Sequence, residues 1–390
     1  MVITELIFKN MRHLNKLTVF SVSAAVAVLG ACQPKYELDT DFTVPDELNC
    51  PAAVTLDVTS SDLITFSWTG GMAADGGVVL YNVLIDKESG DFSSPVATMK
   101  SDLGAECTLT LTQSDLNVIA RKAGITPEHT GTLKWTVTAS RGGVVRMSDK
   151  TAEIKVTRGE GIDNIPSDLY LYGSGAEKEG QHFRTASEGK FVIYARLKSG
   201  KIQFRSSASG DAFVYYADAN GKLKEENMEM DSPAKEEVTR LTVDFNTLSV
   251  KADAIGSDVR CIWGCTFDNV AVLSYKGEGK FSGEGDIRFV QSDRPETNPP
   301  SWLSWTEERY YFIAKVNGAD TCWGRGDSIS AERPVGGEGP EFYELHEFGW
   351  SQWDHLWKMS GSLDMKHAVI SIDTDASNRM VHSFENVRAL

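Results

Sequence analysis

The chain has 390 residues, a formal net charge of −16 at pH 7, and 41% hydrophobic residues. This length is enough for two or three domains with cores of their own. So acidic a chain is poorly suited to nucleic acid, which we exclude as a partner, and better suited to a neutral or cationic ligand.

Residues 1–31 have the pattern of a secretory signal peptide. Arg12 and Lys16 precede the apolar run at residues 17–31, which is too short to span a bilayer stably. The run leads into Leu29-Gly30-Ala31-Cys32, which resembles the bacterial lipobox, where the cysteine becomes the first mature residue and carries a diacylglycerol. We therefore predict that Cys32 is lipidated and anchors the chain to a membrane. The alternative is an ordinary secretory signal that happens to end near a cysteine.

An acidic tether is predicted at residues 32–50. This segment has little apolar surface to bury and contains two prolines and five acidic residues: Pro34, Pro45, Glu37, Asp39, Asp41, Asp46 and Glu47. Acidic residues soon after a lipidated cysteine resemble the surface-export signal of some Gram-negative lipoproteins. We therefore expect an outer-membrane, lipid-anchored protein exposed at the cell surface. Removal of residues 1–31 takes away a net charge of +2 and leaves −18.

Five cysteines remain besides Cys32, and their number and spacing do not indicate a metal site. They are Cys50, Cys107, Cys261, Cys265 and Cys322. No C-x-x-C occurs, and no histidines stand at zinc-ligand spacing from Cys261 and Cys265. We expect buried thiols, with disulfides left open, and neither a metal nor a cofactor.

The fold class predicted is all-β, with tandem β-sandwich domains. Residues 51–157 hold closely spaced runs of β-branched and alternating residues, which favour an immunoglobulin-like or fibronectin-III-like sandwich. One short helix is predicted from Ser114 to the stop at Gly124.

Two further β-rich units are predicted after a Gly/Pro linker at residues 158–167. Residues 168–257 form the second sandwich, with a hairpin turn at Asn220-Gly221. Residues 258–390 form the third, which is rich in aromatic residues.

Seven of the nine tryptophans lie between residues 263 and 357. Trp302 and Trp305 stand in a proline-broken loop, and loops run over the surface. An indole there can stack on the flat C–H face of a sugar ring and still offer an N–H. We predict that these rings bind glycan; the alternative is that they plug one end of a sandwich.

Two further groups of residues are candidates for the same site. Trp323 with Arg325 combines an aromatic ring with a guanidinium group that can donate two parallel hydrogen bonds. Trp350, Trp353 and Trp357 have the spacing of one helical face, which is also the spacing of a core stripe. The predicted glycan-binding residues are Trp302, Trp305, Trp323, Arg325, Trp350 and Trp353.

No enzyme signature is found in the chain. A glycosidase needs two carboxylates at a fixed separation, one with a raised pKa. Glu344 with Glu347, or Asp373 with Asp375, could be nominated, but neither pair is distinguished from the other acids. Residues 373–378 lack the glycine and the glutamate of a calcium loop, so they indicate a polar turn. No catalytic residue is predicted.

The first domain resembles the SusE/SusF-like surface glycan-binding lipoproteins. The residues that carry this resemblance are Leu63–Trp68, Val79–Asp86, the helix from Leu116 to Gly124, and Gly131–Val137. It covers residues 36–157 well, and the remainder only in architecture. The resemblance implies non-catalytic capture of oligo- or polysaccharide at the cell surface and transfer to an outer-membrane importer. A structural subunit that docks onto the importer is the alternative, and a glycoside hydrolase a further one.

Overall fold

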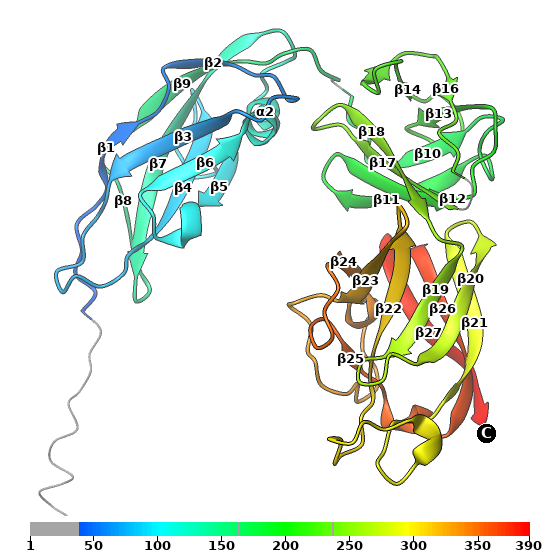
Figure 1. Cartoon of the computed structure of the whole chain (residues 1–390). Helices are drawn as coiled ribbons and strands as arrows, with labels where there is room; N and C mark the ends of the chain where they lie inside the picture. The colour runs from blue at the N-terminus through cyan, green and yellow to red at the C-terminus, as the bar shows by residue number, and fades with distance from the viewer. Residues whose placement is uncertain (1–38, 163, 236–237) are drawn as a thin grey trace, which may run out of the picture.

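The computed structural model describes residues 39–162, 164–235 and 238–390 (Figure 1). The predicted signal peptide and Cys32 lie outside these residues. Strands dominate the described chain, and the fold class predicted from the sequence, all-β with sandwich domains, is confirmed. Within the described ranges, no helix is both long and apolar enough to cross a membrane.

The N-terminal unit packs two sheets face to face. One has the order β1–β3–β6, and the other β2–β9–β7–β4–β5, with β8 paired to β7. The strands are β1 (Asp46–Asn49), β2 (Ala53–Thr55), β3 (Leu63–Thr69), β4 (Leu80–Lys87), β5 (Ala97–Lys100), β6 (Thr108–Thr112), β7 (Thr130–Arg141), β8 (Val144–Met147) and β9 (Ala152–Thr157). Their alternating residues meet in one core, where the rings of Phe66 and Trp135 pack edge to face at 5.1 Å.

The predicted helix is α2 (Gln113–Lys122), which connects β6 to β7. It begins one residue earlier than expected because Thr112, not Ser114, is the N-cap. Thr112 and Asp115 form a capping box, in which each side chain accepts from the other's backbone N–H. Gly124 follows the helix with a φ of 88°, as the C-terminal glycine signal requires.

The predicted tether is too long at its C-terminal end. Residues 46–49 form β1, which pairs with β3, and Phe42 is buried in the core of the N-terminal unit. The acidic side chains Asp46 and Glu47 point to solvent, while Leu48 packs against the core. The many acidic residues led us to predict an unfolded tether, but the few apolar residues of this segment are enough to hold it against the sheet.

The rest of the chain forms one continuous hydrogen-bonded path of strands from β10 to β27. Its first half is β10 (Leu169–Tyr172), β11 (Gln181–Ser187), β12 (Lys190–Ala195), β13 (Lys201–Arg205), β14 (Val214–Ala217), β15 (Leu223–Glu225), β16 (Met230–Asp231), β17 (Val238–Asp244) and β18 (Ser249–Ile255). The predicted hairpin joins β14 to β15, and Gly221 takes the positive φ of its turn.

The second half of this path makes up the C-terminal unit. It comprises β19 (Asp258–Trp263), β20 (Asn269–Gly277), β21 (Lys280–Ile287), β22 (Arg309–Val316), β23 (Ala319–Arg325), β24 (Leu345–Phe348), β25 (Trp357–Lys358), β26 (Lys366–Ala376) and β27 (Arg379–Ala389). Short 3-10 turns lie at Asp102–Gly104, Pro295–Thr297 (η2), Pro340–Tyr343 and Gly361–Leu363.

The second and C-terminal units share a core across the predicted boundary at residues 257 and 258. Val192, Tyr194 and Ile255 pack in the same cluster as Phe281 and Trp323. The edge-to-face contact of Tyr194 with Trp323, at 5.9 Å, crosses this boundary. β18 also pairs directly with β22 through Ile255 and Val316. The two units are therefore one packed body.

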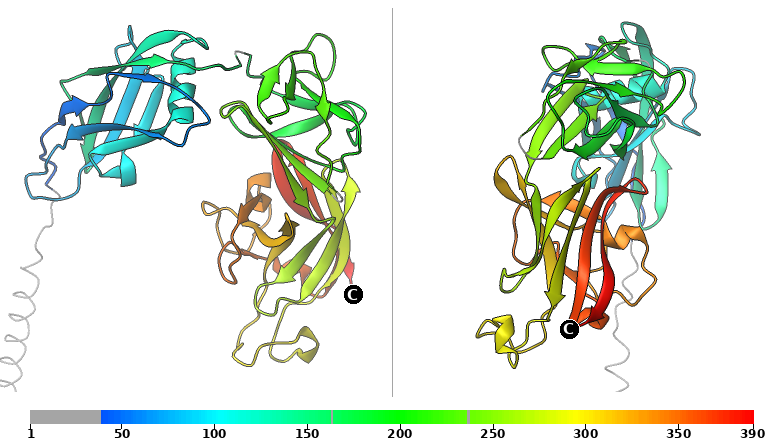
Figure 2. Two further views of the ribbon diagram at one scale, coloured as in Figure 1. Left: turned by 45° about the horizontal axis from the view of Figure 1, so that its top comes forward. Right: turned by 90° about the vertical axis from the view of Figure 1, so that its right-hand side faces the viewer.

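The N-terminal unit stands apart from this body (Figures 1 and 2). Its contacts with the second unit include polar ones: Glu188 lies 3.3 Å from Arg121 and 2.8 Å from Lys122, and the Ser114 hydroxyl donates to the Asn246 carbonyl. Val58 adds an apolar contact by packing against the core of the second unit. The predicted linker is not wholly solvated, because Ile162 packs into the core of the second unit. All five described cysteines are free, and Cys261, Cys265 and Cys322 are buried as expected.

Candidate functional site

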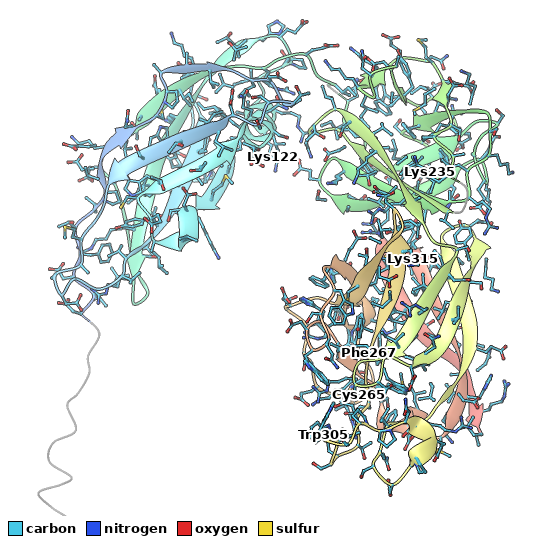
Figure 3. The ribbon with its side chains drawn as sticks, viewed as in Figure 1. Lys122, Lys235, Cys265, Phe267, Trp305 and Lys315 are labelled. Carbon is cyan, nitrogen blue, oxygen red and sulfur yellow. The ribbon has the colours of Figure 1, made fainter. Side chains whose placement is uncertain are left out.

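Exposed tryptophans gather on two loops of the C-terminal unit. Trp302 and Trp305 lie between β21 and β22, and Trp353 lies between β24 and β25. Their rings touch in series: Trp302 is 5.8 Å from Trp305 and 6.0 Å from Trp353 between ring centroids. Each residue is 45–50% exposed. We call these three residues the tryptophan triad; Figure 3 labels Trp305 at the end of the unit remote from the second unit.

Buried anchors hold the two loops of the triad in place. Leu303, between the two exposed tryptophans of the first loop, is itself buried in the core. Leu356 anchors the second loop by packing into a small cluster with Ile262. Leu356 can pack there because residue 264 is a glycine: a Cβ at Gly264 would clash with Leu356 Cδ2, at a distance of 2.3 Å. The tryptophans therefore stay exposed because the neighbouring Leu303 and Leu356 occupy the core positions of the two loops.

A buried ion pair lies under the triad. Glu307 is 1% exposed, and both of its oxygens accept hydrogen bonds from Arg309, at 2.8 and 2.9 Å. The same carboxylate accepts from the indole N–H of Trp305 at 2.9 Å, and the Arg309 guanidinium lies 5.6 Å from the centre of the Trp353 ring. One Glu–Arg pair thus orients two of the three rings.

The cysteine beside this ion pair is unreactive. Burial raises the pKa of the Cys265 thiol to about 11, and the nearby Glu307 carboxylate adds to that rise. The thiol is therefore protonated at neutral pH, and a protonated thiol is a poor nucleophile. Cys265 accordingly does not supply covalent chemistry to this surface.

A second aromatic pair, Phe267 and Trp350, lies on the same unit. Their ring centroids are 6.1 Å apart, and the two residues are 43% and 57% exposed. Phe267 was not predicted as a site residue. Phe267 lies in the tight turn between β19 and β20, where its φ is 63°. A residue in a turn does not take part in the alternation of a strand, so its side chain is not directed into the core by that pattern.

The prediction for Trp323 is wrong. Trp323 is 1% exposed, packs against Tyr194 and Phe281, and directs its N–H to Glu347 at 3.3 Å. Its strand is covered on both faces at this point, because the neighbouring Cys322 and Gly324 are buried as well. It offers no face on which a sugar could stack.

Arg325 is likewise not a ligand-binding fork. It donates to the carbonyls of Leu356, Gly326 and Ile329, and so ties β23 to the following loop and to the loop that carries Trp353. All of these acceptors are backbone oxygens, which makes Arg325 a structural residue.

Trp350, Trp353 and Trp357 do not share a helical face. The segment before β25 is irregular, with His355 at a φ of 61°, and Trp357 begins β25 fully buried against Tyr310. Trp350 and Trp353 remain outside as predicted for a surface site. The helical spacing of the three tryptophans is therefore coincidental, because two of them lie in a loop and the third lies in a short strand.

The nominated carboxylate pairs are engaged with cations or histidine. Glu347 pairs with Arg240, and Glu344 with Arg379. Asp375 accepts a hydrogen bond from His182 Nδ1 at 2.7 Å, and Asp373 lies 3.5 Å from Lys280. Each of these four carboxylates is thus held by a neighbouring basic side chain. In the described part of the chain, no group of histidine, cysteine and acidic side chains could hold a metal ion.

The fold and this surface define an all-β protein of three β-rich units whose last unit displays an open aromatic surface. Residues 32–138 match the model of the family described as SusE outer membrane protein. The match covers the N-terminal part of the chain and supports a place at the outer membrane. No protein with a curated description matches the chain.

Proposed function

We propose that the tryptophan triad binds neutral oligo- or polysaccharide without cleaving it. The observation that carries the proposal is the contact of three indoles that remain half exposed although their loops are anchored by buried leucines. Large apolar rings in contact on an open surface are costly to leave in water unless a ligand covers them. Sugar rings have the flat C–H faces that such rings can cover.

The charge beneath the triad favours a neutral ligand. Glu307 and Arg309 neutralise each other, so this pair leaves no net charge beneath the rings. Asp268 and Asp354, on the neighbouring loops, are acidic and would repel a polyanion. Aromatic stacking would therefore supply most of the affinity, and the guanidinium and indole N–H groups would fix orientation.

We also propose how the protein is attached to the membrane and where the bound glycan goes. Cys32 carries the lipid anchor, the protein faces the cell surface, and the bound glycan passes to an outer-membrane importer. The family match begins at Cys32, the residue predicted to be the first of the mature chain, which supports this arrangement. Single open sites bind weakly, so repeated sugar units along one polymer would raise the avidity.

Affinity electrophoresis of residues 33–390 through gels that contain plant, host or microbial polysaccharides tests the proposal. We expect retardation by at least one neutral polymer, and a loss of about tenfold in affinity in Trp302→Ala and in Trp353→Ala, since central aromatic contacts each contribute more than about 1 kcal/mol. Phe213→Ala is the matched control, because Phe213 is 50% exposed in the second unit, outside the triad.

Two outcomes would contradict the proposal. One is the absence of retardation by every polymer, which would favour docking onto the importer as the main role. The other is retardation that the triad variants leave unchanged. Release of reducing sugar during incubation would instead indicate a hydrolase.

A further inference from the structure

A cavity lies where the second and C-terminal units meet, remote from the triad. It has a volume of about 590 Å³, within the range of small-molecule sites. Figure 3 labels Lys235 and Lys315 there, and Trp305 at the opposite end of the C-terminal unit. Its walls come from the end of β18, the sheet β20–β19–β22, and the turn after β22.

Strand register gives the cavity an apolar floor. Val272, Arg260 and Ile313 are directly paired across β20, β19 and β22, so their side chains lie in one row on one face. Ile313 and Ile255 are buried, while Val272 remains 43% exposed. The floor is therefore a strip of aliphatic surface large enough for one face of a small ring.

Three cations and two carboxylates line the rim. Asp320 is shared by Lys315 at 2.9 Å and Arg260 at 3.4 Å, and Asp258 accepts a hydrogen bond from the Ser274 hydroxyl at 2.6 Å. For the ammonium group of Lys235, no ion pair is found among the described residues. The described residues that line the cavity thus have a surplus of one positive charge, in a chain whose net charge is −16.

We infer that this cavity binds a carboxylated sugar, with the carboxylate between Lys235, Lys315 and Arg260 and one face of the ring on Val272. The single surplus charge matches a monoanionic carboxylate better than a dianionic phosphate. That the ring is a sugar rests on the proposed function. The substrate would then be a mainly neutral polymer with uronic-acid branches, whose neutral part stacks on the triad.

Calorimetric titration of residues 33–390 with an oligosaccharide that ends in glucuronic acid, and with the same oligosaccharide ending in glucose, tests the inference. We expect the acidic ligand to bind about tenfold more tightly. Its affinity should fall several-fold between 50 and 500 mM NaCl, because the rim charges are solvent-exposed. The double variant Lys235→Gln with Lys315→Gln should remove the difference between the ligands.

Lys122→Gln is the matched control, since it removes one ion-paired lysine on the N-terminal unit. Trp302→Ala separates the two sites: it should weaken retardation by neutral polymer and leave the glucuronate preference unchanged. The inference is overturned if both ligands bind equally, if the lysine variants do not change the preference, or if Trp302→Ala abolishes it. Retardation of the unmodified chain by neutral polymers, measured separately, reports on the proposed function itself.

Discussion

At the scale of single residues, burial separates side chains that the sequence presents as equivalent. Trp302, Trp305 and Trp353 are half exposed, whereas Trp323 and Trp357 are among the largest fully buried side chains. All five lie in the same aromatic-rich region. The same indole therefore either fills the core or faces solvent, and the two roles predict different responses to truncation.

Trp323→Ala should lower the free energy of unfolding by about 3–5 kcal/mol, because it leaves a large cavity in the core shared by two units. Trp302→Ala should change it by less than about 1 kcal/mol, since the ring is half exposed. Urea titrations followed by fluorescence measure both. Equal losses for the two variants would show that the triad is part of the core, contrary to the structure.

His382 makes the stability of the C-terminal unit depend on pH. Burial lowers the pKa of this histidine to about 3. In its neutral ring, Nε2 lies 2.8 Å from the Tyr310 hydroxyl and Nδ1 lies 2.9 Å from the Tyr343 carbonyl oxygen. The carbonyl can only accept, so Nδ1 carries the proton. The ring must therefore stay neutral in the folded chain, while in the unfolded chain it takes up a proton near pH 6.5.

The resulting stability is complete above about pH 6.5 and is lost as the pH falls toward 3. By proton linkage, we expect His382 to account for a loss of about 2 kcal/mol between pH 7.5 and pH 5. His182 and His367, whose pKa values are raised by carboxylate partners, act in the opposite direction. The comparison is therefore between the unmodified chain and His382→Gln, in which those two histidines are unchanged. Denaturant titrations at both pH values should show a smaller pH dependence for the variant; the same dependence in both would contradict this assignment.

At the scale of elements, the alternation of apolar residues predicted the strands and the end signals predicted the helix α2. The helical spacing of residues 350–357 predicted a helix that is not present. The strands of the N-terminal unit and the helix α2 have local signals that agree with their tertiary surroundings. The stripe at residues 350–357 has a capping pair, in which the Asp354 backbone N–H donates to the Ser351 hydroxyl, yet the segment is held as a loop by Leu356 and Gly264. Side-chain spacing and a capping residue therefore do not suffice to identify a helix where tertiary contacts hold the backbone in another conformation.

The capping box of α2 gives a direct test at this scale. Thr112→Ala should lower the stability of the N-terminal unit by about 1 kcal/mol, because the backbone N–H of Asp115 loses its acceptor. Thr112→Ser retains a hydroxyl and should restore most of that loss. Thermal unfolding monitored by circular dichroism distinguishes them, and an equally destabilised serine variant would point to lost β6 packing instead.

At the scale of the whole molecule, the chain divides after the N-terminal unit and not between the second and C-terminal units. The N-terminal unit has a core cluster of its own. The cluster that contains Trp323 draws Val192, Tyr194 and Ile255 from across residue 257. A cut there would expose those side chains to water on both fragments.

Fragments should reflect this division. We expect residues 33–160 and residues 161–390 each to fold alone, and residues 258–390 to be unfolded or aggregated because their shared core is incomplete. Near-ultraviolet circular dichroism and limited proteolysis measure the outcome. Native-like protection of residues 258–390 would show that the contact of Tyr194 with Trp323 is dispensable.

The sequence by itself determined the all-β class, the sandwich of the N-terminal unit, the helix, and the exposed tryptophans at 302, 305, 350 and 353. These follow from local signals: alternation, capping residues, and prolines that force a loop to the surface. Only the tertiary structure decided that Trp323 is core, that Phe267 is exposed, that Glu307 and Arg309 orient the triad, and that two units share one core. The core position of Trp323 and the shared core depend on which distant residue occupies a given position, and contacts between distant residues leave no periodic trace in the chain. Trp305, Glu307 and Arg309 are close in sequence, but only the fold brings Arg309 against Trp353.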